Sequence, residues 1–206
     1  KIINEKERQY LHNLDELPFA SQVYSKHLNI KDYFYGHVSY PMVSIFTSRG
    51  CNARCSYCVY PQTMFGNFRH RSPKSIVDEL DWITKNLKEV KEVLIDDDTF
   101  SMYPKHAREV AQLIIERKVK IKWTCETRAN LDYETLKLMH KAGCRLVVVG
   151  FESTDQKVLN NVRKGINQSN VDKFVDDCKK ANVKIHACSM AGNPGDSFET
   201  LNNTLD

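Results

Sequence analysis

Three cysteines within eight residues constrain this chain more than any other feature. Cys51, Cys55 and Cys58 follow a C-x3-C-x2-C spacing, directly after an apolar run at 42–46 and a turn at 49–50. One loop can bring these thiolates to one place, which suits an iron–sulfur cluster, whose usual ligands are cysteine thiolates. A 4Fe–4S cluster held by three cysteines leaves one iron open to a substrate or cofactor. The same spacing also permits a zinc site that lacks its fourth ligand.

The other cysteines and the overall composition narrow the class of protein. Seven cysteines, three of them clustered, argue against a secreted disulfide framework and favour metal in a reducing compartment. We expect the four scattered ones to be buried small apolar residues. These are Cys125, Cys144, Cys178 and Cys188.

Length and charge exclude several partners. The 206 residues predict one globular domain, and the net charge of +4 is too small to indicate a nucleic-acid partner. No apolar run approaches the roughly 20 residues of a membrane-spanning helix. The polar segment 1–9 has no signal-peptide core. We therefore expect no membrane span and a cytoplasmic location.

From residue 42 onward, short apolar runs alternate with amphipathic segments. Strands are predicted at 43–47, 93–95, 121–125, 146–149 and 183–190. Helices are predicted from Pro73 after the N-cap Ser72, from Pro104, after the N-cap Asp132, at 154–162, at 168–181 and from near Ser197. Wholly apolar runs are typical of parallel strands buried on both faces. The pattern indicates an α/β fold, either barrel-like or doubly wound.

Residues 1–40 lack this alternation. Pro18 biases its predecessor away from helix, so 14–19 is predicted to be an extended connector. Aromatic residues are frequent between 24 and 40. We expect either a segment that wraps the domain surface or a linker from an upstream domain that is absent from this chain.

Each predicted strand is followed by a polar or glycine-rich signature. The five signatures are the cysteine loop, the acids at 96–98, Glu-Thr-Arg at 126–128, Gly-Phe-Glu-Ser at 150–153 and Gly-Asn-Pro-Gly at 192–195. Active sites of α/β barrels are built from loops at the carboxyl ends of the strands. The sequence therefore predicts one site to which all five signatures contribute.

These features resemble the radical S-adenosylmethionine (SAM) superfamily. The resemblance rests on Cys51-x3-Cys55-x-Tyr57-Cys58, with an aromatic residue before the last cysteine, and covers residues 42–206. It implies a partial (β/α) barrel that stops after its fifth strand. The expected organisation is a connector at 1–40, from an absent upstream domain, and a core at 41–206 that is incomplete at its C-terminus.

Within the superfamily, the chain is most similar to enzymes with a cobalamin-binding domain before the core. The similarity lies in the segments 14–19, 96–100, 150–153, 163–165 and 192–196, the last departing from the usual Gly-x-Pro-Gly-Glu. Methylthiotransferases and coproporphyrinogen dehydrogenase-type enzymes share several of these features. The chain itself holds no cobalamin domain, so cobalamin is expected only in the full-length protein.

The resemblance also implies a chemistry. Cys51, Cys55 and Cys58 would hold a 4Fe–4S cluster whose open iron is chelated by the amino and carboxylate groups of SAM. Reductive cleavage would give methionine and a 5′-deoxyadenosyl radical, used for methyl transfer, C–C bond formation or cyclisation. A flavodoxin or ferredoxin would supply the electron, and a small molecule would receive the radical.

The strand-end residues receive roles from the same resemblance. Asp97 or Asp98 would accept from the SAM ammonium, and Arg128 would bind the carboxylate through its planar fork, with Glu126 as a polar neighbour. The acids could instead cap a helix or bind a divalent metal.

The remaining roles concern the nucleoside half of SAM. Glu152 would accept from a ribose hydroxyl or orient Arg128, and Tyr57 would lie near the adenine. Gly192 and Asn193 would let backbone groups reach the adenine edge. Alternatively, Arg128 and Glu152 form a structural ion pair, and 192–195 is only a turn.

Two other functions remain open. One is a methylthiotransferase acting on RNA or a ribosomal protein, which would need a second cysteine trio upstream. The other is a non-catalytic iron–sulfur protein for electron transfer or scaffolding, whose cluster spectrum would not respond to SAM.

Overall fold

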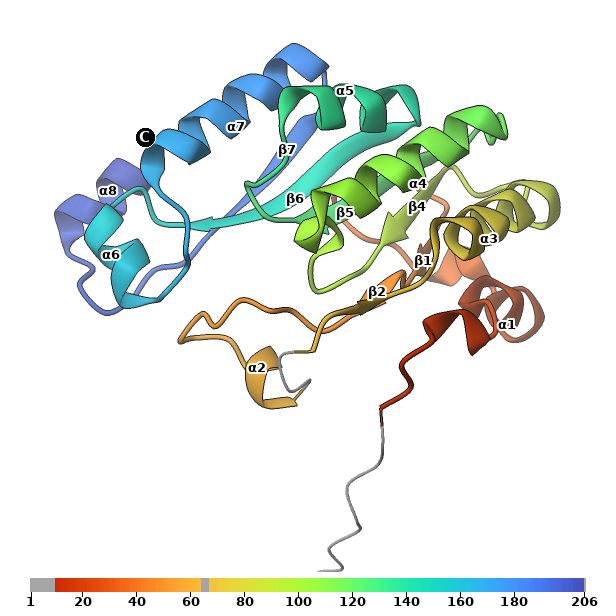
Figure 1. Cartoon of the computed structure of the whole chain (residues 1–206), viewed down its shortest axis with the longest axis horizontal. Coiled ribbons are helices and arrows are strands. Elements are labelled where there is room, and N and C mark those ends of the chain that lie inside the picture. The colour runs from red at the N-terminus through yellow and green to blue at the C-terminus, as the bar shows by residue number, and fades with distance from the viewer. Residues whose placement is uncertain (1–9, 64–66, 206) are drawn as a thin grey trace, which may run out of the picture.

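A computed structural model describes residues 10–63 and 67–205 of the chain. Its main sheet has five parallel strands in the order β1-β4-β5-β6-β7 (Figure 1). The strands are β1 (Met42–Ile45), β4 (Glu92–Ile95), β5 (Lys122–Thr127), β6 (Cys144–Glu152) and β7 (Lys184–Ser189). The order runs in one direction, without the reversal that marks a doubly wound sheet. The five predicted strands and the barrel-like α/β class are confirmed.

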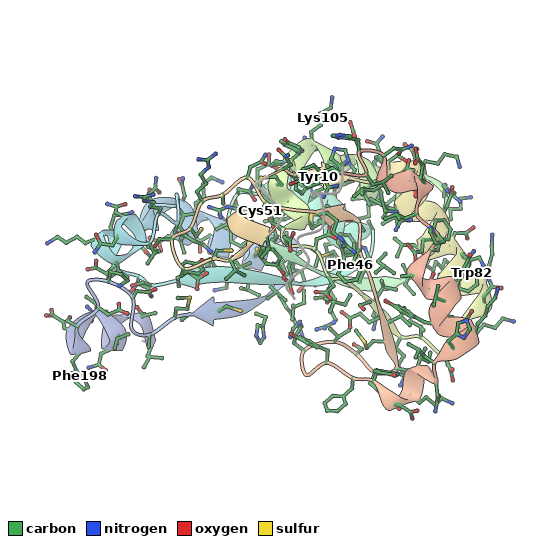
Figure 2. All side chains as sticks on the ribbon, turned by 90° about the horizontal axis from the view of Figure 1, so that it is seen from below. Tyr10, Phe46, Cys51, Trp82, Lys105 and Phe198 are labelled. Carbon is green, nitrogen blue, oxygen red and sulfur yellow. The ribbon has the colours of Figure 1, made fainter. Side chains whose placement is uncertain are left out.

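Helices connect successive strands and lie on one face of the sheet (Figures 1 and 2). The connecting helices are α3 (Pro73–Asn86), α4 (Pro104–Glu116), α5 (Tyr133–Lys141), α6 (Gln156–Asn161) and α7 (Gln168–Ala181), and α8 (Phe198–Leu205) follows β7. The pairs α3–α4, α4–α5 and α5–α7 pack side by side, in the order of the strands. This is the arrangement that βαβ units of one hand produce.

The helix starts follow the predicted caps. The Ser72 side chain accepts from the Ser75 N–H before Pro73, and the Asp132 side chain accepts from the Thr135 N–H. Each cap satisfies a backbone donor that the helix leaves unpaired. After α5, Gly143 adopts φ +99°, a backbone conformation that favours glycine.

The core lies between the sheet and these helices. Trp123 on β5 is fully buried, and its indole donates to the Ala142 carbonyl at 3.0 Å. Aliphatic side chains at helical spacing belong to the same core, each worth about 1.5–3 kcal/mol when fully buried. They include Ile76, Leu80, Ile83, Val110, Ile114, Leu136 and Met139. Cys125, Cys144 and Cys178 are also buried here, as predicted, whereas Cys188 is only half-buried.

The segment before β1 packs against the first helical unit. It contains η1 (Leu14–Glu16), α1 (Ala20–His27) and η2 (Ile30–Asp32). The Ser21 backbone and hydroxyl both donate to Glu79 Oε1, at 3.1 and 2.9 Å. Glu79 is fully buried and also pairs with Arg71. Helix α1 is absent from the sequence prediction because its apolar residues are few.

A second buried acid fixes the end of this segment. Glu92 accepts from the Ser39 N–H at 2.8 Å and from Arg145 Nε at 2.9 Å, and its side chain is fully buried. The Arg145 guanidinium also donates to the His37 carbonyl. Residues 37–39 are thereby held against β4 and β6 of the sheet.

A short ribbon leads into and out of the cysteine region. It pairs β2 (Ser48–Arg49) with β3 (Arg69–His70) in antiparallel register, and α2 (Tyr60–Thr63) lies between them in the chain. Two-residue strands have too little pattern to be predicted from sequence. Among the described residues, no helix is both long and apolar enough to cross a membrane.

Candidate functional site

A cavity of about 530 Å³ gathers residues from the cysteine loop, from the last four strands or their ends, and from the N-terminal segment. All three clustered cysteines line it. Figure 2 shows Cys51 near the middle of the molecule, between Trp82 on α3 and Phe198 on α8. Of the other predicted residues, Tyr57, Asp98, Arg128 and Glu152 line the cavity, together with Glu126.

The N-terminal end of the cysteine loop is attached to the residues that follow β4. Asp97 Oδ1 accepts from the N–H groups of Thr47 and Ser48, at 2.6 and 3.0 Å. Asp98 Oδ2 accepts from the Gly50 N–H at 2.7 Å. The two consecutive acids therefore bind three of the four backbone amides that precede Cys51.

The C-terminal end of the cysteine loop is attached to the segment after α6 and to the end of β6. The Ser56 N–H donates to the Val162 carbonyl just after α6, at 2.9 Å, and the Cys58 N–H donates to the Cys55 carbonyl at 3.1 Å. The Tyr57 hydroxyl donates to Glu152 Oε1 at 2.9 Å. Both ends of the loop are thus fixed by parts of the barrel.

The three thiols fit the ligand set of an iron–sulfur cluster. All are free, with Cys55 buried and the other two half-buried at the cavity surface. Burial raises the pKa of the Cys51 thiol, and the positive charge of Arg128 opposes that rise. Within the described residues, no three His, Cys, Asp or Glu side chains converge on a single-ion site. In a cluster each thiolate binds its own iron, so the donors need to line one cavity rather than meet at one point.

Beside the loop, Glu152 forms a buried ion pair with Lys164. Lys164 Nζ lies 2.7 Å from Glu152 Oε1 and 3.0 Å from the Tyr57 hydroxyl. Burial, followed by the charge of Glu152, raises the pKa of Tyr57, so its phenol stays protonated. Glycine at 150 makes room for the pair, because a Cβ there would lie 2.3 Å from Glu152 Oε1 and 2.9 Å from Lys164 Nζ.

Arg128 lines the same cavity just after the end of β5. Its guanidinium donates to the Lys164 carbonyl, and its backbone N–H donates to the Ser101 hydroxyl at 3.0 Å. Glu152 pairs with Lys164 rather than with Arg128, so the alternative of a structural Arg128–Glu152 pair is not what the structure shows. Arg128 and Lys164 together bring two positive charges to the cavity.

The acids at the ends of β4 and β5 differ in their positions. Asp98 and Glu126 line the cavity, and burial, with the nearby charges of 96–98, raises the pKa of Glu126 to about 7. Asp97 is only 2% exposed and does not line it. Of the two acids that the sequence offers for a SAM ammonium, Asp98 lies at the cavity, whereas Asp97 accepts from Thr47 and Ser48. The contact of either acid with SAM stays a prediction.

The turn after β7 also lies outside the cavity lining. Gly192 has φ +89°, the Asn193 N–H donates to Asp196 Oδ2 at 2.7 Å, and Asn193 Nδ2 donates to the Met190 carbonyl at 2.9 Å. These hydrogen bonds are internal to the turn, and the contact of Gly192 and Asn193 with adenine stays a prediction. The segment 192–195 forms a turn that leads into α8.

The wall of the cavity formed by β7 and the N-terminal segment contains residues that sequence reasoning missed. His37 and His186 stack at 4.6 Å between ring centroids, and Tyr35 meets His37 edge-on at 4.7 Å. All three residues line the cavity, as does Cys188. Only the strand register could have indicated His186: it pairs with Val148 on β6, which pairs with Glu126 on β5, so the three residues lie at one level of the sheet.

A one-directional parallel sheet with a three-cysteine loop at its cavity defines a partial (β/α) barrel whose site offers the thiol type of ligand that iron–sulfur clusters use. A sequence model described as "Radical SAM superfamily" matches residues 45–206, and the chain belongs to this superfamily. The cofactors of the family, a 4Fe–4S cluster and SAM, are those that the sequence predicted.

Curated relatives include several methyltransferases. An uncharacterized methyltransferase of Pyrococcus horikoshii is 29% identical over 206 residues, which is 100% of this chain and 44% of the relative. Bacteriochlorophyllide d C-12(1)-methyltransferase of Chlorobaculum tepidum is 27% identical over 80% of this chain and 37% of the relative. The chain therefore spans less than half the length of these relatives.

Solved structures show the same fold. The radical SAM methyltransferase TsrM of Kitasatospora setae, solved with cobalamin and a [4Fe-4S] cluster, matches with a TM-score of 0.72. It is 24% identical, over 80% of this chain and 34% of that one. Methylornithine synthase PylB matches with a TM-score of 0.58 at 16% identity, over 85% of this chain and 52% of that one.

Proposed function

We propose that this chain is the core of a radical SAM enzyme that cleaves SAM reductively and uses the radical for methyl transfer, C–C bond formation or cyclisation. The observation that carries the proposal is that three free thiols line the same cavity as two cations and three acids. That set matches an open-iron cluster together with a ligand that has an ammonium, a carboxylate and a ribose. The methyltransferases and the anaerobic cyclases among the relatives support the reaction class.

The cysteines would hold the cluster, and the charged residues would bind SAM. When bound, the cluster would supply the electron that cleaves SAM to methionine and a 5′-deoxyadenosyl radical. Arg128 suits the carboxylate because its planar fork binds two oxygens at once, and Lys164 adds a second positive charge. Asp98 and Glu126 are the acids available to an ammonium, which has only donors to offer.

The Tyr57–Glu152–Lys164 group would orient the nucleoside. Glu152 Oε1 takes the bonds from Tyr57 and Lys164. The second oxygen, Oε2, can therefore accept from a ribose hydroxyl. Holding both halves of SAM in a fixed orientation is the main contribution that such a protein makes to the rate.

Anaerobic reconstitution tests this proposal. The chain is loaded with iron and sulfide, SAM and dithionite are added, and 5′-deoxyadenosine and methionine are quantified, with a sample lacking reductant as control. We expect both products in equal amounts and only with reductant. A fully loaded cluster that yields neither product would contradict the proposal and favour an electron-transfer or scaffold protein.

The substrate and the partners belong to the same proposal. A small molecule would receive the radical at the end of the cavity lined by Tyr35, His37 and His186. A small electron-transfer protein such as a flavodoxin or ferredoxin would replace dithionite in the cell. Cobalamin would be bound by a part of the protein outside this chain.

A further inference from the structure

The Asp97 carboxylate is directed at the lead-in to the cysteine loop. It accepts from the Thr47 N–H at 2.6 Å, from the Ser48 N–H at 3.0 Å and from the Thr47 hydroxyl. Thr47 and Ser48 precede Cys51 by four and three residues. Every one of these bonds joins the end of β4 to the segment that delivers the first cysteine.

Such a carboxylate is costly to bury. Asp97 is 2% exposed, and a buried carboxylate loses several kcal/mol of hydration unless hydrogen bonds replace it. The bonds from Thr47 and Ser48 are the replacement. If either the carboxylate or this segment moved, Asp97 would be left buried with unsatisfied oxygens, so the two positions are tightly coupled.

The next residues cannot absorb a shift. Gly50 adopts φ +85°, donates to Asp98, and passes so close to Asn67 that a Cβ would lie 2.3 Å from its carbonyl oxygen. Cys51 follows directly. Its position is therefore set by β4 and the β2–β3 ribbon rather than by the loop itself.

We propose that Asp97 is a positioning residue for the cluster, which fixes the Cys51 thiolate relative to the thiolates of Cys55 and Cys58. This inference rests on the proposed cluster but does not require SAM cleavage. Outer partners of metal ligands typically change metal affinity by about 10–100-fold when they are removed. Asp97 would act in this way through the backbone.

The test compares iron retention in three variants at Asp97 or its partner. In Asp97→Asn the amide oxygen can still accept from both N–H groups, so we expect iron loss within about twofold of the unmodified chain. Asp97→Ala removes all three bonds and should speed the removal of iron by a chelator about tenfold. Thr47→Val removes only the hydroxyl bond and should fall between these two.

Glu92→Ala is the matched control. Glu92 lies at the other end of the same strand, is fully buried and is also held by several hydrogen bonds, but it faces the N-terminal segment. We expect this variant to unfold at lower urea concentration, yet to keep the iron-loss rate and the electron paramagnetic resonance spectrum of the unmodified chain. Asp97→Ala should change both. If Asp97→Ala does not fold, the iron-loss rates of Thr47→Val and Asp97→Asn still show whether the hydroxyl bond contributes more than the charge.

Four outcomes would overturn parts of the scheme. An iron-loss rate and spectrum in folded Asp97→Ala equal to those of the unmodified chain would reduce Asp97 to a fold-stabilising residue. Equally rapid iron loss in Asp97→Asn and Asp97→Ala would show that the negative charge of Asp97, rather than its hydrogen-bond geometry, keeps the iron bound. A loaded chain that forms no 5′-deoxyadenosine would overturn only the proposed function, whereas a chain that takes up no cluster would overturn both.

Discussion

The Lys164 ammonium lies 2.7 Å from the Glu152 carboxylate in the wall of the cysteine cavity, and each side chain is only 9% exposed. Glu152 stands at the end of β6 with φ +69°, an unusual conformation for a residue other than glycine. The Tyr57 hydroxyl contacts both partners, so the cysteine loop rests on this pair.

Replacing Lys164 with Met should destabilise the fold by about 3 kcal/mol, because it leaves Glu152 buried without its counter-charge. Urea unfolding measures the loss. The double variant Glu152→Gln, Lys164→Met should recover part of it, since no uncompensated charge remains. Strictly additive effects of the two single changes would contradict a direct coupling.

Alanine at Gly150 should displace the same pair, because its Cβ would come within 2.3 Å of Glu152 Oε1. Overpacking of this kind typically costs about 1–3 kcal/mol. We expect weaker SAM binding, measured by calorimetry on the reconstituted chain. Gly36→Ala is the control: a Cβ there meets nothing within 4 Å, so stability should stay within about 0.5 kcal/mol. Equal effects at the two positions would refute the steric argument.

Cys55→Ala should abolish the visible absorbance of a 4Fe–4S cluster after reconstitution. The reason is that two thiolates cannot replace three in holding it. Cys178→Ala removes a thiol that is fully buried between α7 and the sheet, and it should leave the absorbance unchanged. An intact cluster spectrum in Cys55→Ala would disprove the ligand assignment.

Stability should fall as the pH drops from about 6.5 towards 4, because of His106. Burial, and then the charge of His70, lowers the pKa of His106 to about 4, while Asp15 acts weakly in the other direction. Between these pH values the unfolded state binds a proton that the folded state does not, so protonation favours unfolding. Urea midpoints at pH 7 and pH 5 should differ less in His106→Gln than in the unmodified chain. An unchanged difference would contradict the assignment.

The elements that the sequence predicted are those with strong local signals. Caps at Ser72 and Asp132 and prolines at 73 and 104 mark helix starts through groups only a few residues apart. The convergence of strand ends followed from the alternation of strands and helices. Both depend on local spacing, which a sequence displays directly.

Other features of the site required the three-dimensional arrangement. Lys164 meets Tyr57 across 107 residues, and no local pattern announces that contact. Asp97 and Asp98 are chemically identical neighbours, and only the direction of the strand end decides which one faces the cavity. His37 reaches the cavity through the bond between its carbonyl and Arg145, far along the chain.

The two attachments of the cysteine loop connect separate parts of the barrel. One end is bound to β4 through Asp97 and Asp98, and the other to the segment after α6 through Val162. A change in the separation of these two parts would therefore stretch or relax the span that carries the thiols. Under the proposed ligand assignment, any movement of one of these parts of the barrel against the other would change the positions of the thiols that hold the cluster.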